Sequence, residues 1–149
     1  MTTRRNEFAL LVCIALLSLT GCIFNAGEKV KCQYRPQALT QAATDQPTRI
    51  GVPGSADVGP AKVILATDQI RLIFRGVPFD NNEFNGYTFE VSDEGRFMPD
   101  LIASSPTGLD ISAVHSWTHD NTIYVNLHGV TPRPGDVDEI VLKKNPVQR

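Results

Sequence analysis

The chain has 149 residues, 42% of them hydrophobic, with 14 Lys and Arg against 16 Asp and Glu. This length and composition are typical of one globular domain. The slightly acidic balance lacks the positive charge by which proteins bind phosphate backbones, which excludes nucleic acid as an expected partner. Three histidines and three cysteines supply few ligands, so we expect neither a metal nor another cofactor.

The N-terminus has the parts of an export signal. Arg4 and Arg5 form a short positive segment. Residues 8–19 (FALLVCIALLSL) form an apolar segment that is shorter than the ~20 residues of a membrane span. The segment ends in Leu19-Thr20-Gly21-Cys22. These four residues resemble, at every position, the lipobox of bacterial lipoprotein precursors.

The lipobox resemblance implies a cleaved signal peptide over residues 1–21, with the cut between Gly21 and Cys22, and a diacylglyceryl group on the Cys22 thiol. Two or three acyl chains hold a small protein permanently on a membrane. Ile23 stands where some enterobacterial inner-membrane lipoproteins carry Asp, which favours the outer membrane of a bacterial envelope. The alternatives are an ordinary secretory signal that contains a cysteine by chance and an N-terminal transmembrane helix.

Cysteine usage changes once the chain is processed. Cys13 is lost with the signal peptide and Cys22 carries lipid, so Cys32 is the single thiol left. The mature chain is therefore expected to form no internal disulfide, and its stability must come from its core. We interpret Cys32 as an incidental thiol, and the alternative is a reactive thiol or an intermolecular disulfide.

Residues 22–60 are predicted to be a lipid-anchored flexible tether. From residue 25 onward this stretch shows no sustained helical or strand period, and Pro47, Pro53 and Pro60 interrupt it. About 35 flexible residues reach roughly 30–35 Å, which would hold the folded part away from the membrane. The alternative is an edge strand at residues 48–52.

Residues 61–149 are predicted to form a single small β-sandwich. Apolar and polar residues alternate in short stretches that are separated by turn-forming residues. About seven short antiparallel strands are expected, at residues 61–65, 70–75, 87–91, 96–98, 109–118, 122–127 and 139–143. Strands that are apolar on one face need a second sheet to cover that face, which favours a sandwich.

The hairpin at residues 115–128 is the most informative stretch for function. A two-residue loop, Asp120-Asn121, would pair Trp117 with Tyr124 and create a polar and aromatic outer face. This candidate binding face consists of His115, Trp117, His119, Tyr124, Asn126 and His128. A three-residue loop would instead turn Trp117 into the core. A lone tryptophan in a β-sandwich is more often buried, which favours the second register.

Other chemistry has weak support in the sequence. The three histidines do not form a tetrahedral metal set. The acidic loop at residues 80–86 offers oxygen ligands but does not fit the EF-hand spacing, and turn formation explains it better. Residues 135–142 faintly resemble the last strand of jelly-roll carbohydrate-binding modules. Because hydrolase, phosphate-loop and zinc-protease motifs are missing, the protein is not expected to be an enzyme and no catalytic residue is assigned.

The sequence therefore predicts a lipid-anchored envelope protein whose β-sandwich binds another envelope protein. Such a protein would be an assembly or secretion component, or an immunity protein that inhibits a toxin or a cell-wall hydrolase. The alternative is a module that binds glycan or peptidoglycan through Trp117 and Tyr124. Beyond the lipobox, the mature domain resembles no family.

Overall fold

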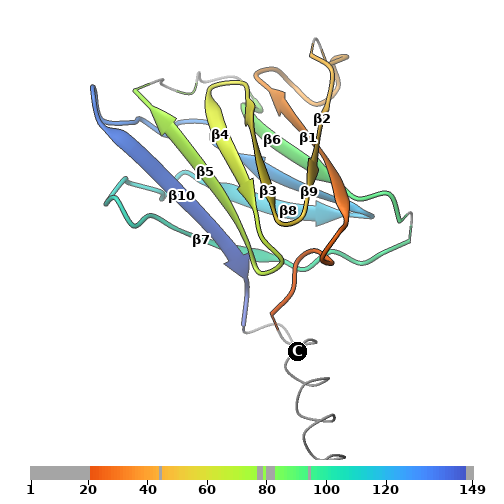
Figure 1. Cartoon of the computed structure of the whole chain (residues 1–149). Helices are drawn as coiled ribbons and strands as arrows, with labels where there is room; N and C mark the ends of the chain where they lie inside the picture. The colour runs from red at the N-terminus through yellow and green to blue at the C-terminus, as the bar shows by residue number, and fades with distance from the viewer. Residues whose placement is uncertain (1–20, 44, 77–78, 80–82, 94, 147–149) are drawn as a thin grey trace, which may run out of the picture.

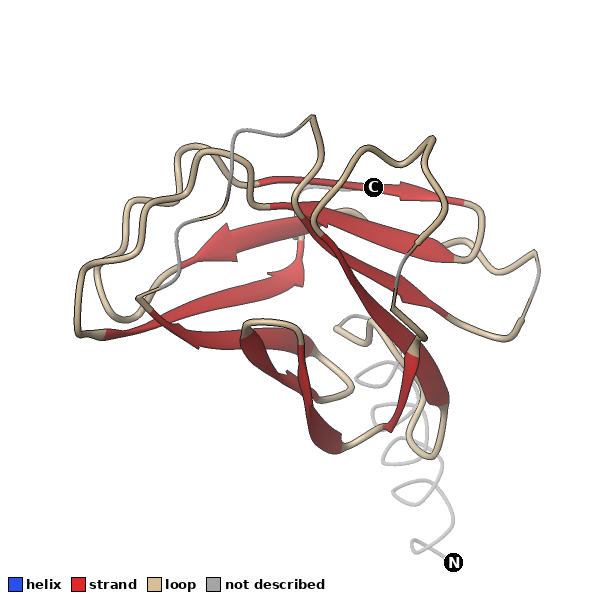
Figure 2. Ribbon diagram, turned by 90° about the horizontal axis from the view of Figure 1, so that it is seen from above, coloured by secondary structure: helices blue, strands red, loops and turns tan. Residues whose placement is uncertain are grey.

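The computed structural model describes residues 21–43, 45–76, 79, 83–93 and 95–146. These residues form two antiparallel five-stranded sheets around one core, with strand orders β2-β1-β6-β9-β8 and β3-β4-β5-β10-β7 (Figure 1). The strands are β1 (Lys29–Arg35), β2 (Thr48–Gly51), β3 (Gly54–Val58), β4 (Ala61–Leu65), β5 (Gln69–Arg75), β6 (Gly86–Glu90), β7 (Leu101–Ser104), β8 (His115–His119), β9 (Thr122–Asn126) and β10 (Val137–Lys144). Figure 2 shows strands and loops and no helix in the described part of the chain. The predicted all-β sandwich is confirmed.

Alternating side chains build the core, as β4 and β5 show. Val63 of β4 lies opposite Leu72 of β5, and Leu65 lies opposite Ile70. All four side chains are fully buried. Burial of each large aliphatic side chain contributes about 1.5–3 kcal/mol. The strands predicted at residues 61–65 and 70–75 are confirmed, and they pair as an antiparallel hairpin.

The predicted tether is wrong over residues 29–58, which contain β1, β2 and β3. β1 lies inside the first sheet, between β2 and β6, and β3 is an edge strand of the second sheet. The alternative prediction of an edge strand at residues 48–52 is confirmed by β2. The prolines fit this arrangement because Pro47 and Pro60 lie outside the strands and Pro53 lies in the connection between the two sheets.

β1 was missed although its sequence carries a strand signal. Val30 and Cys32, both fully buried, and Tyr34, which packs against the core, alternate with the polar residues of the strand, which is the period of a strand with one buried face. Its main partner is distant in the chain, since Arg35 pairs with Gly86, and local alternation does not indicate that pairing.

The chain joins the domain directly after Cys22. Ile23 and Phe24 are fully buried, and their backbone N–H groups donate to the carbonyl oxygen of Thr67 at 2.5 and 3.1 Å. The Arg96 guanidinium donates to the Ile23 carbonyl oxygen at 2.7 Å and to the Glu28 carboxylate at 2.5 Å. The two charged side chains are only 18% and 10% exposed. Residues 23–28 are thus part of the folded unit, and the predicted tether is wrong here too.

Two later strands also differ from the prediction. Residues 96–98 are a loop, and the strand that follows is β7, which pairs with β10. Of residues 109–118, the first part is a loop and only the last part belongs to β8. In that loop the Asp110 carboxylate accepts the backbone N–H of Ser112 at 3.0 Å. Such a local bond competes with pairing in a strand.

Candidate functional site

The β8–β9 hairpin has a two-residue turn, Asp120-Asn121. Trp117 pairs with Tyr124 and His119 pairs with Thr122, so the register that exposes Trp117 is correct and the favoured register that buries it is wrong. Asp120 adopts φ 52°, a left-handed conformation that a short polar side chain tolerates. The Asn121 amide donates to the carbonyl oxygen of Val91, which fixes the turn against the end of β6.

The hairpin separates its two faces by alternation. Ile123, Val125 and Leu127 are fully buried between the sheets. Trp117 and Tyr124 lie on the outer face and are partly buried there, whereas His115 and His119 are exposed. The predicted separation into a core face and an outer face is therefore present.

The outer side chains form an aromatic cluster around Trp117. The rings of Trp117 and Tyr124 are parallel within 4°, with centroids 5.2 Å apart, so they stack on one another. The His115 ring lies 5.4 Å from the Trp117 ring. Phe84 meets Trp117 edge to face at 5.9 Å and is itself buried. Pairs of this kind add about 0.5–1.5 kcal/mol beyond the area that they bury.

Phe84 was missed by the sequence analysis. It lies in the segment before β6, where a single apolar residue among Asn, Glu and Gly shows no period. Its position depends on Asn85, whose backbone carbonyl oxygen accepts the N–H of Leu127 at 2.8 Å. The Asn85 side-chain oxygen also accepts the hydroxyl of Tyr34 at 2.9 Å. Only contacts with distant strands place Phe84 on Trp117.

Asn126 holds the Phe84 segment instead of facing a ligand. Its side-chain oxygen accepts the backbone N–H groups of Asn85 and His128, each at 3.1 Å. Its amide nitrogen donates to the carbonyl oxygen of Glu83 at 3.3 Å. Asn126 is therefore a positioning residue, and His128, which follows β9, lies partly buried beside it.

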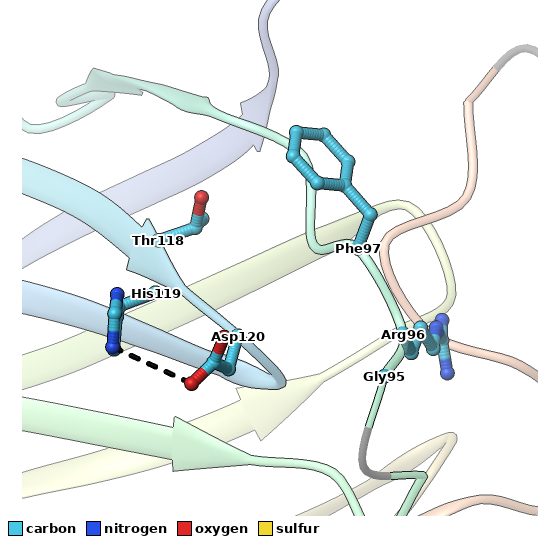
Figure 3. Close-up of a pocket in the computed structure, with 6 residues that line it drawn as sticks. All are labelled: Gly95, Arg96, Phe97, Thr118, His119 and Asp120. Carbon is cyan, nitrogen blue, oxygen red and sulfur yellow. Dashed lines mark ion pairs between the residues drawn. The ribbon is translucent and has the colours of Figure 1, made fainter.

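His119 lies apart from the cluster, at the end of β8. Its Nε2 is 3.4 Å from the carboxylate of Asp120. Figure 3 shows the two side chains beside a surface hollow of about 280 Å³. The hollow is lined by Gly95, Arg96, Phe97, Thr118, His119 and Asp120. The structure thus brings together His115, Trp117 and Tyr124, but not all six predicted residues.

The described residues contain no group of three or more His, Cys, Asp or Glu side chains that could hold a metal ion. Much of the acidic loop considered for calcium, at residues 80–82, lies outside the described residues. Cys32 is fully buried, and this burial raises the pKa of its thiol. A buried neutral thiol is a poor nucleophile, which supports its interpretation as an incidental thiol.

The structure describes only the last residues of the region predicted to carry the signal peptide and the lipid anchor. Cys22 is exposed and Gly21 is partly buried, while the rest of the predicted signal peptide, residues 1–20, lies outside the described residues. Within the described part of the chain, no helix has the length and apolar character needed to cross a membrane. No protein-family model, curated protein or solved structure matches this chain.

Proposed function

We propose that this protein is a lipid-anchored bacterial envelope lipoprotein whose β-sandwich binds another envelope protein. The anchor is the lipid predicted on Cys22, in the outer membrane. The binding surface is the outer side of β8 and β9, called here the aromatic face and defined by His115, Trp117, His119 and Tyr124. The observation that carries the proposal is that an edge strand directs aromatic and imidazole side chains outward.

An aromatic edge strand suits a protein partner for two reasons. Trp and Tyr provide a large contact area at a low cost in side-chain entropy. In addition, β8 is the last strand of the first sheet. Its Ser116 hydroxyl donates to the carbonyl oxygen of Leu101 on β7 at 3.3 Å, so a partner would contact the outer face of β8 and not its backbone edge. His115 and His119, exposed at the two ends of β8, can form hydrogen bonds with that partner.

The partner belongs to one of two classes. The first is a component of envelope assembly or secretion that this protein holds at the membrane. The second is a toxin or a cell-wall hydrolase, which the domain would inhibit by covering its active site. Both classes use the same aromatic face, and identification of the bound protein distinguishes them.

Glycan or peptidoglycan binding is the alternative function. Trp117 and Tyr124 are both partly exposed on the outer face, which favours this alternative. However, a sugar packs on a free ring face, and here each ring covers a face of the other. The protein-binding proposal does not need a free ring face, so it has the stronger support.

Affinity capture from an envelope extract tests the proposal. The bait is the full lipoprotein in mild detergent, compared with a Trp117→Ala, Tyr124→Ala double variant and with Val137→Ala as a matched control. Val137 is also an exposed apolar residue, but it lies on β10 of the other sheet. We expect one protein to bind the parent and the control and to be lost from the folded double variant.

Other outcomes of the capture contradict the proposal. Retention of peptidoglycan and no protein, with loss in the double variant, supports the glycan alternative. Equal retention of a partner by all three baits places the binding surface elsewhere on the domain. Circular dichroism of each bait shows whether the sandwich is intact before binding is compared.

A further inference from the structure

No spacer separates Cys22 from the folded core. The next residue, Ile23, is fully buried, and its backbone N–H donates to the carbonyl oxygen of Thr67 at 2.5 Å. Cys22 itself is exposed. Because one residue extends the chain by at most ~3.6 Å, a lipid bonded to the Cys22 sulfur must begin at the surface of the domain.

Three segments that are distant in sequence surround this attachment point. Thr67 belongs to the turn between β4 and β5. The carbonyl oxygen of Val52, in the connection between β2 and β3, accepts the N–H of Gly27 at 2.7 Å. Arg96, in the loop after β6, donates to the Ile23 carbonyl oxygen. These contacts define one end of the sandwich, the lower end in Figure 1.

Phe97 is the unusual feature of this end. Its side chain is 82% exposed, which is the largest value for a large hydrophobic residue among those that the structure describes. It directly follows Arg96, whose bonds to Ile23 and Glu28 hold the loop beside the attachment point. Figure 3 shows Phe97 across the hollow from His119 and Asp120.

We propose that Phe97 inserts into the lipid surface that holds Cys22, and that the two residues together fix the orientation of the sandwich on the membrane. The inference rests on the proposed lipid anchor. A domain attached at one point tilts about it, whereas an apolar contact beside that point restricts the tilt. Proteins at membrane interfaces bury apolar side chains about 5–10 Å into the boundary between headgroups and acyl chains.

This orientation also places the aromatic face. Asp120 lines the same hollow as Phe97, so the β8–β9 turn lies near the membrane. His115 pairs with Asn126 at the other end of the hairpin and lies farther from the membrane. A partner would therefore meet β8 from the side, along a strand that rises from the lipid surface.

Tryptophan quenching by brominated lipids tests the insertion. The chain has a single tryptophan, so Trp117→Phe gives a background without emission from tryptophan. Phe97→Trp in this background is compared with Val137→Trp, at a position that is 43% exposed. Val137 pairs with Arg75, at the end of the β5–β10 ladder opposite Gln69 and the attachment point. Each lipidated protein is placed in phosphatidylethanolamine and phosphatidylglycerol vesicles.

We expect a blue shift and a loss of emission with brominated acyl chains for Phe97→Trp, and neither for Val137→Trp. Flotation of the vesicles tests the lipid anchor on Cys22 separately from the insertion of Phe97. A protein that floats but shows equal emission at both positions retains its anchor and overturns the insertion of Phe97. A protein that fails to float lacks the lipid anchor, which overturns the proposed anchor and this inference with it.

Hydrogen exchange gives a second measurement on the unsubstituted lipoprotein. We expect the backbone amides of residues 95–98 to exchange more slowly on vesicles than in the unlipidated Cys22→Ala protein. The amides of Arg133, Gly135 and Asp136, near Val137, serve as the internal control and are expected to exchange equally in both samples. Equal exchange of residues 95–98 in the two samples would contradict the insertion of Phe97. This measurement leaves Trp117 and the aromatic cluster unsubstituted.

Discussion

Gly86 shows how a single residue decides whether two strands can pair. It begins β6 opposite Asn126, and a Cβ built on it would lie 1.9 Å from the carbonyl oxygen of Val125. Because that oxygen belongs to the backbone of a central strand, it cannot move aside cheaply. We expect Gly86→Ala to lower the free energy of unfolding by about 3 kcal/mol, measured by urea denaturation of the unlipidated Cys22→Ala protein.

Gly51→Ala is the matched control for this substitution. Gly51 also lies in a strand, but a Cβ there meets nothing within 4 Å. We expect its effect to stay within about 0.5 kcal/mol of zero. Equal effects of the two substitutions would contradict the argument from close approach.

Cys32 should be chemically silent in the folded protein. Its side chain is fully buried, and burial raises the pKa of the thiol, so little thiolate is present to react. In the Cys22→Ala protein without its signal segment, we expect a thiol reagent to label Cys32 only after unfolding. Rapid labelling of the native protein would instead support the reactive-thiol alternative.

Asp138 connects protonation to stability. The carboxylate is fully buried, and burial by itself raises its pKa. The backbone N–H and the guanidinium of Arg133 donate to it at 3.0 and 2.9 Å. These bonds outweigh burial, so the pKa of Asp138 lies below its usual value. The unfolded chain therefore binds this proton more tightly than the folded one.

The lowered pKa of Asp138 in the folded protein determines how stability changes with pH. The contribution of Asp138 is fully present above the unfolded pKa of about 4 and is lost as the pH falls through the lower folded value. We expect Asp138→Asn to cost about 1–3 kcal/mol at pH 7 and the difference from the parent to shrink below about pH 4. Urea denaturation of both proteins from pH 7 to below about pH 4 measures this difference, and Asp57→Asn, at an exposed position, is the control. A stability difference between Asp138→Asn and the parent that does not vary with pH would contradict the prediction.

At the scale of elements, the segment at residues 83–85 depends on Asn126 at the end of β9. Asn126→Ala removes the acceptor of two backbone N–H groups, and each buried donor left unpaired costs about 1–3 kcal/mol. Asn126→Asp keeps that acceptor and loses only the bond to the Glu83 carbonyl oxygen. We expect the Ala variant to lose more stability than the Asp variant.

The fluorescence of Trp117 reports whether the segment at residues 83–85 keeps its position, because Phe84 packs on the Trp117 ring. We expect Asn126→Ala to release Phe84 and to expose Trp117 to water, with a red shift of emission, while Asn126→Asp keeps emission close to that of the parent. A red shift of equal size in both variants would show that the side-chain oxygen of Asn126 does not position the segment.

At the scale of the whole molecule, residues 23–58 are part of the sandwich and not an appendage. β1 lies between β2 and β6, and β3 forms an edge of the second sheet. Ile23 and Phe24 complete the core. The domain therefore begins directly after the proposed lipid attachment at Cys22. With that anchor the sandwich would lie at the membrane surface, whereas a flexible tether would hold it roughly 30–35 Å away.

The anchor itself makes a direct prediction. Cys22→Ala should abolish lipid labelling and release the protein from the outer-membrane fraction, because the proposed thioether on Cys22 would carry the acyl chains that hold the protein there. Sucrose-gradient fractionation of the envelope checks both release and location. Cys32→Ala is the control and should leave both unchanged. Membrane retention of the Cys22→Ala protein would contradict lipid anchoring.

The sequence by itself determined the elements whose signal is local. Alternation located β4, β5, β6, β9 and β10, and their one-sided apolar character required a sandwich. The turn residues limited the β8–β9 hairpin to two registers, and the one that was favoured, which buries Trp117, is wrong. The lipobox resemblance is equally local and stays a prediction, since residues 1–20 are outside the described residues.

Tertiary structure decided everything that depends on a distant partner. It selected the register that exposes Trp117, placed Phe84 on that ring, and attached Ile23 to Thr67 and Arg96. It also paired β1 with β6, a strand that is distant in the chain. A periodic pattern specifies which side of a strand is buried, but not which strand covers it. That second choice is made by packing and hydrogen bonds between residues far apart in the chain.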